Sequence, residues 1–314
     1  MRKICFFISV ALNFFIPKTY ANQNCKAIRI SDVGWTDITA TTSVANLLLK
    51  SMGYEVKEKN LSLQITFNSL KNNDIDVFLG AWLPSMSTIL EPYEKNKQIE
   101  KIGTLLQNAN YTLAVPSYVY DAGVQSIADL AKYNDKFQTK IFAIEPGNDG
   151  NKNIQKMIDD NAYGLKNWKM VESSEQAMLM QVYSAYKSKK WIVFLGWQPH
   201  PMNTKINMKF LKGGENYFGP DQGKSTVHTI TRKNFALDCP NLANFLKNIQ
   251  FTVKNENELM DMILYKNIEP KKAAEIWLKQ NLPTVEKWIV NVNNFDGTKT
   301  TLQTIEKNLF NSQK

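Results

Sequence analysis

The first part of the chain alternates between short apolar runs and longer segments in which apolar residues recur at helical spacing. Residues 26–32, 54–57 and 76–79 have the composition of strands, and the last of these contains the buried run VFL. Residues 36–53 and 64–73 lie between them and place apolar side chains every three or four positions. The order strand, helix, strand, helix, strand predicts an α/β layer with a parallel or mixed sheet.

A second unit of the same kind follows, and the last third of the chain changes character. Strands are expected at residues 111–116, 140–144 and 191–195, and helices at residues 126–130, 151–161 and 174–187. From residue 241 onward the spacing is mostly helical, over residues 242–253, 256–266, 270–281 and 284–290. The pattern therefore predicts two α/β units followed by a helical segment.

One phrase occurs twice, once in each unit. Residues 77–86 read VFLGAWLPSM and residues 193–202 read VFLGWQPHPM. Each phrase begins as a buried strand and continues into a Trp, a Pro and a Met. Ligands of open α/β sheets bind outside the carboxyl ends of strands. The repeated phrase therefore predicts two similar lobes that each present a Trp to a shared cleft.

The N-terminus has the pattern of an export signal. Arg2 and Lys3 precede an apolar run over residues 4–17, and Thr19-Tyr20-Ala21 resembles a signal-peptidase site. We expect residues 1–21 to be a signal peptide that is cleaved after about Ala21, with an uncleaved anchor as the alternative. No later stretch is long and apolar enough for a membrane helix, so an exported, soluble mature protein is expected.

The cysteines predict a disulfide bond across most of the chain. Cys5 lies in the expected signal, which leaves Cys25 and Cys239 as an even pair in an exported protein. Two free thiols are the alternative. Such a bond returns the helical segment to the first unit, so lobe one would comprise residues 22–110 plus 220–314 and lobe two residues 111–219. Two lobes joined by two crossings can hinge around a ligand.

Composition and motifs argue against several classes of protein. The 314 residues are 43% hydrophobic and 21% charged, which is ordinary for a globular protein. The net charge of +9 falls to +6 without the signal, and the lysines are scattered, which argues against nucleic-acid binding.

His200 and His228 lack metal-spaced partners, and the glycine motifs of hydrolases, P-loops and Rossmann folds are absent. We expect no enzyme activity, no metal and no cofactor. His200 is expected to bond a backbone group locally, and His228 to lie in a strand.

The positive signal is a set of aromatic residues expected at strand ends: Trp35, Trp82, Tyr111 and Trp197. A box of aromatic faces binds a bulky cation such as a quaternary ammonium, which has no ordinary hydrogen-bond donor. The other tryptophans lie within helical or strand patterns and are expected in the core, at Trp168, Trp191, Trp277 and Trp288.

At these residues the chain resembles a known family. SDVGWTDITATT, FLGAWLPSM, ANYTLAVP, IEPGNDGN and VFLGWQPHPM, in this order, are similar to the choline-binding proteins of importers driven by an ATP-binding cassette, within the wider glycine betaine-binding family. The resemblance extends from about Cys25 to the region of Pro283. It implies two α/β lobes of the type II-like periplasmic binding arrangement, two hinge crossings and a ligand in the interlobe cleft. It also implies a disulfide near Cys25 and Cys239, a permease as partner and a periplasmic location.

The resemblance also assigns roles to residues. Trp35, Trp82, Tyr111 and Trp197 would form the aromatic box, Asp37 would face the ammonium, and Asn148 would bind the choline hydroxyl. Two of these residues have plainer explanations: Asp37 could cap the following helix, and Asn148 could be a turn residue, with Asp149 as the competing polar candidate.

The carboxylate of Asp37 favours a net cation over a zwitterion, so choline is expected ahead of betaine. We expect a monomer. The alternatives are a glycine betaine or carnitine receptor and, from another class, a periplasmic enzyme acting on choline derivatives.

Overall fold

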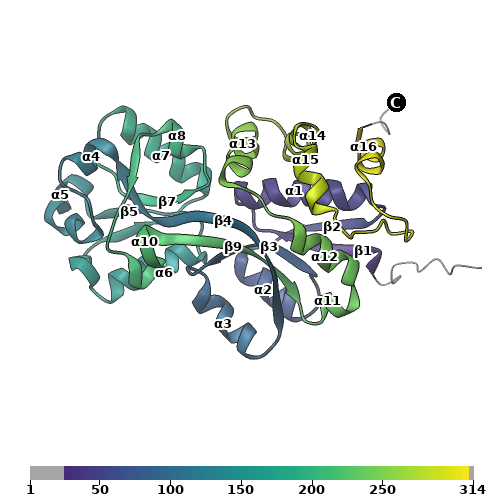
Figure 1. Cartoon of the computed structure of the whole chain (residues 1–314). Coiled ribbons are helices and arrows are strands. Elements are labelled where there is room, and N and C mark those ends of the chain that lie inside the picture. Colours follow the sequence, from purple (N-terminus) through teal and green to yellow (C-terminus); the bar gives the residue numbers. More distant parts are fainter. Residues whose placement is uncertain (1–24, 311–314) are drawn as a thin grey trace, which may run out of the picture.

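The computed structural model describes residues 25–310, and the expected signal at residues 1–21 lies outside the described residues. Figure 1 shows two lobes joined by the long strands β4 and β9. The first lobe contains β1–β3, α1–α3 and α11–α16, and the second contains β5–β8 and α4–α10. Among the described helices, none is both long and apolar enough to cross a membrane.

The strands are β1 (Ala27–Asp32), β2 (Glu55–Asn60), β3 (Val77–Leu83), β4 (Ile99–Pro116), β5 (Lys140–Phe142), β6 (Lys169–Val171), β7 (Phe194–Gln198), β8 (Met208–Phe210) and β9 (Lys224–Arg232). Over residues 25–310 they form one sheet in the order β2-β1-β3-β9-β4-β7-β5-β6, and β8 pairs with β4. β1 is parallel to β2 and β3, and β5 is parallel to β6 and β7, whereas β9 is antiparallel to both β3 and β4. The mixed α/β sheet predicted from the pattern is confirmed.

The helices of the first lobe are α1 (Thr36–Ser51), α2 (Leu63–Lys71), α3 (Ser87–Lys95), α11 (Phe235–Asp238), α12 (Pro240–Asn248), α13 (Val253–Leu264), α14 (Pro270–Gln280), α15 (Leu282–Trp288) and α16 (Leu302–Phe310). Those of the second lobe are α4 (Ser117–Asp121), α5 (Asn134–Phe137), α6 (Asp149–Asp159), α7 (Glu175–Lys187), α8 (Met202–Lys205), α9 (Glu215–Phe218) and α10 (Pro220–Gly223), with 3-10 turns at Ile127–Tyr133 and Ala162–Gly164. The helical last third is confirmed, although α16 has no counterpart among the predicted helices. The segment predicted as a helix at residues 126–130 is instead a 3-10 turn.

β4 is much longer than the predicted strand at residues 111–116. It has 18 residues, pairs with β9 over residues 99–110 and with β7 over residues 110–114. The β4–β9 ladder contains three register shifts, which break the strict alternation of side chains that sequence reading depends on. Tyr111 therefore lies inside a strand rather than at its start. β9 contains His228, as expected.

The two copies of the repeated phrase form matching corners. β3 extends past the predicted residue 79 to Leu83, and β7 lies at residues 194–198 rather than 191–195. Trp82 and Trp197 are therefore inside the ends of their strands, not beyond them. Each strand ends at a cis peptide bond to proline, Leu83–Pro84 in one and Gln198–Pro199 in the other.

The predicted disulfide is confirmed and returns the chain to the first lobe. Cys25 and Cys239 are bonded, with a Cα–Cα distance of 5.7 Å. α1 packs against α13, α14 and α16, so the helical last third covers the first lobe (Figure 1). Of the tryptophans expected in the core, Trp168, Trp277 and Trp288 are buried, whereas Trp191 is partly exposed beneath Lys136.

Candidate functional site

Four aromatic side chains from four elements meet where the two lobes face each other. Trp82 comes from β3, Tyr111 from β4 and Trp197 from β7, and Trp35 immediately precedes α1. The ring of Tyr111 lies 5.7 Å from that of Trp82 and 6.4 Å from that of Trp197, measured between centroids. Tyr111 and Trp197 are also paired across the β4–β7 ladder. The two matching corners therefore supply two walls of one cage, with Tyr111 between them.

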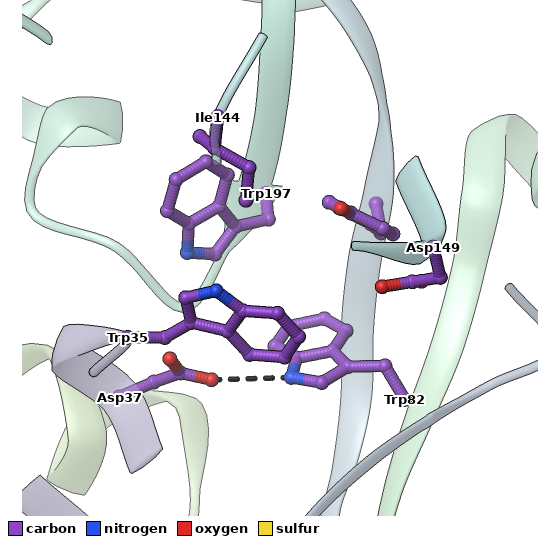
Figure 2. A pocket seen from close by; sticks show the side chains of 7 residues that line it. Trp35, Asp37, Trp82, Ile144, Asp149 and Trp197 are labelled. Carbon is purple, nitrogen blue, oxygen red and sulfur yellow. Dashed lines mark hydrogen bonds between the residues drawn. The ribbon is translucent and has the colours of Figure 1, made fainter. Parts of the chain in front are cut away.

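The cage is a narrow space between the lobes, with a cavity volume of about 20 Å³. It is lined by Trp35, Asp37, Trp82, Tyr111, Ile144, Asp149 and Trp197. This volume is well below the ~300–1,000 Å³ of typical small-molecule sites, so the ligand must be small. Figure 2 shows the three indole rings converging, with Asp37 and Asp149 on opposite sides of them. Five of the six residues predicted for the site are thus brought together.

The polar edges of two indoles are occupied by carboxylates of the protein. Trp35 Nε1 donates to Glu145 of the second lobe, and Trp82 Nε1 donates to Asp37 Oδ2 at 3.1 Å. With these N–H groups engaged, the rings offer the cavity their apolar, electron-rich faces. Such faces attract a cation and have no hydrogen bond to give to an uncharged polar ligand.

Tyr111 is held in place by two glycines. A Cβ on Gly150 would lie 2.2 Å from the Tyr111 hydroxyl, and one on Gly223 would lie 2.0 Å from its carbonyl oxygen. Larger residues at these positions would displace the ring. Burial raises the pKa of the Tyr111 hydroxyl well above its usual range, so this residue stays neutral in the cage.

Asp37 is not the N-cap of α1, so the capping explanation is wrong. The N-cap position belongs to Trp35, and Asp37 lies in the first turn, where the helix dipole favours an anion. The side chain is 3% exposed. Burial, with a smaller contribution from the nearby Glu175 carboxylate, raises the pKa of Asp37 to about 7. A cation placed in the cage would favour the ionised form of this carboxyl.

The structure separates the two polar candidates at the start of α6. Asn148 caps this helix, because its Oδ1 accepts from the Asn151 N–H at 2.8 Å and its Nδ2 donates to the Glu145 carbonyl. Asn148 lines a neighbouring pocket and not the cage. Asp149 does line the cage, is 2% exposed, and has an Oδ2 with no hydrogen-bond partner among the described residues. Burial raises its pKa to about 6.

Further carboxyls that sequence reading missed surround the cage. Burial raises the pKa of Glu145 to about 6, and it raises that of Glu256 in α13 well above its ordinary range, with Asp37 as a second cause. Glu175 acts electrostatically on Asp37. Glu145 stands in the motif IEPGNDGN and could have been noticed there, whereas Glu175 and Glu256 carry no local signal. None of the side chains that line the cage is basic.

The two histidines have structural partners in this arrangement. His200 Nδ1 accepts from the Met202 backbone N–H at 2.9 Å, which confirms the expected local bond. His200 Nε2 lies 3.1 Å from Glu175 Oε1. Over residues 25–310 there is no group of His, Cys, Asp and Glu side chains suited to a metal ion.

A small, carboxylate-flanked cage between two α/β lobes is typical of substrate-binding proteins of membrane importers. The family model for the substrate-binding domain of ABC-type glycine betaine transport systems matches residues 26–280. This chain belongs to that family. The fold and the family expected from the five motifs are confirmed.

Three relatives illustrate the range of the family. The structure of an ABC-transporter choline-binding protein in complex with choline is 45% identical, covers 91% of this chain and 99% of its own, and has a TM-score of 0.88. Lactococcal OpuAC, closed on glycine betaine, is 29% identical, covers 84% of this chain and 99% of its own, and has a TM-score of 0.75. The glycine betaine/carnitine transport binding protein GbuC of Listeria monocytogenes is 34% identical over 148 residues, 47% of this chain and 48% of its own length.

Proposed function

We propose that this protein captures choline in the interlobe cage and delivers it to the permease of an ATP-binding-cassette importer. The observation that carries the proposal is the charge of the cage: Asp37 and Asp149 line it from opposite lobes, and no basic side chain does. A trimethylammonium group can be held only by aromatic faces, dispersion and Coulomb attraction. Each face contributes about 0.5–2 kcal/mol when desolvated. Four faces are enough for micromolar affinity, about −8 kcal/mol.

The opposite end of the ligand distinguishes choline from betaine. Asp149 Oδ2 is buried and unpartnered among the described residues, so it can accept a hydrogen bond from the choline hydroxyl. Asn148 has both polar atoms engaged, since Oδ1 caps α6 and Nδ2 donates to the Glu145 carbonyl, and it would have to leave these partners to reach the ligand. The carboxylate of betaine would approach two carboxylates and find no positive partner. We therefore infer that Asp149, rather than Asn148, contacts the hydroxyl.

The remaining parts of the proposal concern the whole protein. Lobe one would comprise residues 22–110 plus 220–314 and lobe two residues 111–219, except that α10 (Pro220–Gly223) lies with lobe two (Figure 1), and β4 and β9 would be the crossings. The protein would be exported, act as a monomer in the periplasm and bind its ligand without transforming it. The extracytoplasmic location of the family supports the expected location. The family's role in transport, together with the engagement of both ring nitrogens of His200 by Met202 and Glu175, supports binding without transformation.

The test is calorimetric titration of the ligand-free protein with choline, and then with glycine betaine under the same conditions. We expect low-micromolar dissociation of choline and at least about tenfold weaker binding of betaine. Tetramethylammonium separates the contribution of the head group from that of the hydroxyl. If betaine binds more tightly than choline, betaine is the substrate instead. If neither ligand produces heat on titration, the cage is not a cation site.

The affinity for choline should depend on pH. Burial raises the pKa of Asp37 to about 7, and this carboxyl is faced by Glu175 from α7, Glu256 from α13 and Tyr111 from β4. A cation binds best to the ionised carboxyl, so affinity should be highest above pH 7 and fall as the pH drops through this value. We expect binding to be about 10- to 30-fold weaker at pH 5.5 than at pH 8. Titrations at both pH values check this, and Asp37→Asn should flatten the difference.

A further inference from the structure

The N-terminus of α1 receives its cap from the other lobe. Its own N-cap residue, Trp35, makes no capping bond through its side chain. Instead, the Thr36 N–H donates to Glu175 Oε2 at 3.0 Å. Glu175 is the first residue of α7 in the second lobe and is 2% exposed. A helix N-terminus has unsatisfied N–H groups and a positive dipole end, so a carboxylate is a strong cap for it.

His200, in the second lobe, forms a hydrogen bond with the Glu175 carboxylate. The Met202 N–H donates to His200 Nδ1, so this nitrogen carries no proton and Nε2 is the protonated one. Nε2 then donates to Glu175 Oε1 at 3.1 Å. The histidine is completely buried, and its ring packs edge-on against the cage residue Trp197, with centroids 4.9 Å apart. The two oxygens of Glu175 thus accept one bond from each lobe.

The capped turn carries two cage residues. Trp35 precedes Thr36 and Asp37 follows it, so any displacement of this turn moves an aromatic wall and the carboxylate together. The bond from Thr36 to Glu175 joins the two lobes, so a separation of the lobes would break it. We propose that Glu175, backed by His200, is a positioning residue that caps α1 across the cleft on closure and thereby fixes Trp35 and Asp37 around the bound cation. The identity of this cation rests on the proposed function.

The charge of Glu175 gives a bound cation a further effect on closure. Its carboxylate acts repulsively on that of Asp37, and both are buried. A closed, empty cleft holds these like charges together without compensation, whereas a cation in the cage offsets them. The contact between Lys205 of α8 and Asp261 of α13 also joins the lobes, but its side chains are 46% and 30% exposed and 3.7 Å apart. Solvent screens such a pair, so the buried cap is the stronger link.

Glu175→Gln tests the cap with little change in shape. Glutamine has one carbonyl oxygen for the two donors, Thr36 N–H and His200 Nε2–H, and it has no charge. We expect the dissociation constant for choline to rise about 10- to 100-fold. The increase should lie in the dissociation rate, because the cap forms after the ligand has entered; stopped-flow tryptophan fluorescence measures both rate constants. The matched control is Ser174→Ala, which removes the cap of α7 itself, in which the Ala177 N–H donates to Ser174 Oγ, and keeps Glu175 unchanged.

A second variant removes the donor instead of the acceptor. Thr36→Pro deletes the capped N–H at the first helical position, where proline is tolerated, and Trp35 already has the extended backbone that a following proline requires (φ −77°, ψ 137°). We expect the same loss of affinity, and the double variant with Glu175→Gln should lose little more than either single change. The proposal would be overturned if choline dissociated from Glu175→Gln and Thr36→Pro at the wild-type rate. It would also be overturned if Ser174→Ala raised the dissociation rate as much as these variants do.

The cap can be tested even if choline proves not to be the ligand. Wild-type protein that binds neither choline nor betaine would contradict the proposed function but not the cap. Spin labels at Lys71→Cys in α2 and Lys187→Cys in α7, both exposed positions, then report the distance between the lobes. We expect Thr36→Pro, which removes the capped N–H and leaves the charge of Glu175 in place, to shift the distance distribution of the ligand-free protein toward longer values. An unchanged distribution would overturn the cap.

Discussion

Trp82→Ala is expected to weaken choline binding by about 100-fold or more. The substitution removes one aromatic face, worth about 0.5–2 kcal/mol toward a desolvated cation. It also removes the N–H that donates to Asp37 Oδ2 at 3.1 Å, and hydrogen bonds to charged groups contribute about 1.5–3 kcal/mol. The two losses act on the same ligand contact. Calorimetric titration with choline measures the combined effect.

Two variants separate these contributions. Trp82→Phe keeps an aromatic face and loses only the N–H, so we expect a loss of about tenfold. Trp168→Ala is the matched control, because Trp168 is also buried and also donates its Nε1–H, to Asn134 Oδ1 at 2.8 Å, but lies away from the cage. Both alanine variants should lower the stability of the fold by about 3–5 kcal/mol. If Trp168→Ala weakened choline binding as much as Trp82→Ala, the loss would reflect destabilisation rather than the cage.

Asp37→Asn is expected to change selectivity as well as affinity. The amide keeps an oxygen that can accept from Trp82 Nε1, so the local geometry is preserved while the charge is removed. We expect choline to bind about 100-fold more weakly. The affinity for betaine should fall little or rise, because the Asp37 carboxylate that repels the betaine carboxylate is gone. Titration of the variant with both ligands measures the ratio of their dissociation constants.

The thermal stability of Asp37→Asn and a control substitution on the surface provide two further checks of this prediction. Burial raises the pKa of Asp37 to about 7, so the ionised carboxyl disfavours the folded, closed state increasingly as the pH rises from about 4 to about 7. The ligand-free variant should therefore unfold at the same temperature as the wild type at pH 8, or at a higher one. Asp159→Asn removes the same charge from the exposed end of α6 and should leave both affinities within about twofold. An equal loss for choline and betaine in Asp37→Asn would contradict the electrostatic role of this residue.

Local patterns were sufficient for much of the fold and most of the cage. Periodicity located the α/β units and the helical last third, because burial of one face imposes a period on the sequence. The even cysteine pair identified the disulfide, and the repeated phrase identified Trp82 and Trp197 as equivalent corners. The pattern misplaced their strands by several residues, since Gly80 and Gly196 interrupt the apolar runs but not the strands.

Local sequence patterns could not decide whether Asn148 or Asp149 lines the cage. Both are short polar residues in the same turn, and a helix can begin at either. In the structure α6 begins at Asp149, which leaves Asn148 to cap it and directs the Asp149 side chain into the cage. A shift of one residue at a helix start rotates each side chain by about 100°. Which residue meets the ligand thus depends on where the helix begins.

The pattern of residues alone specified the order of elements, the two-lobed class, the disulfide and four aromatic walls, because each of these depends on spacing along the chain or on residue type. Tertiary structure alone showed that Glu175 and Glu256 lie beside the cage and which contacts join the lobes. Glu175 is 139 residues from Thr36 along the chain and 3.0 Å from it in space. Coulomb energies and burial depend on distances and surroundings in three dimensions, and neither can be obtained from spacing along the chain.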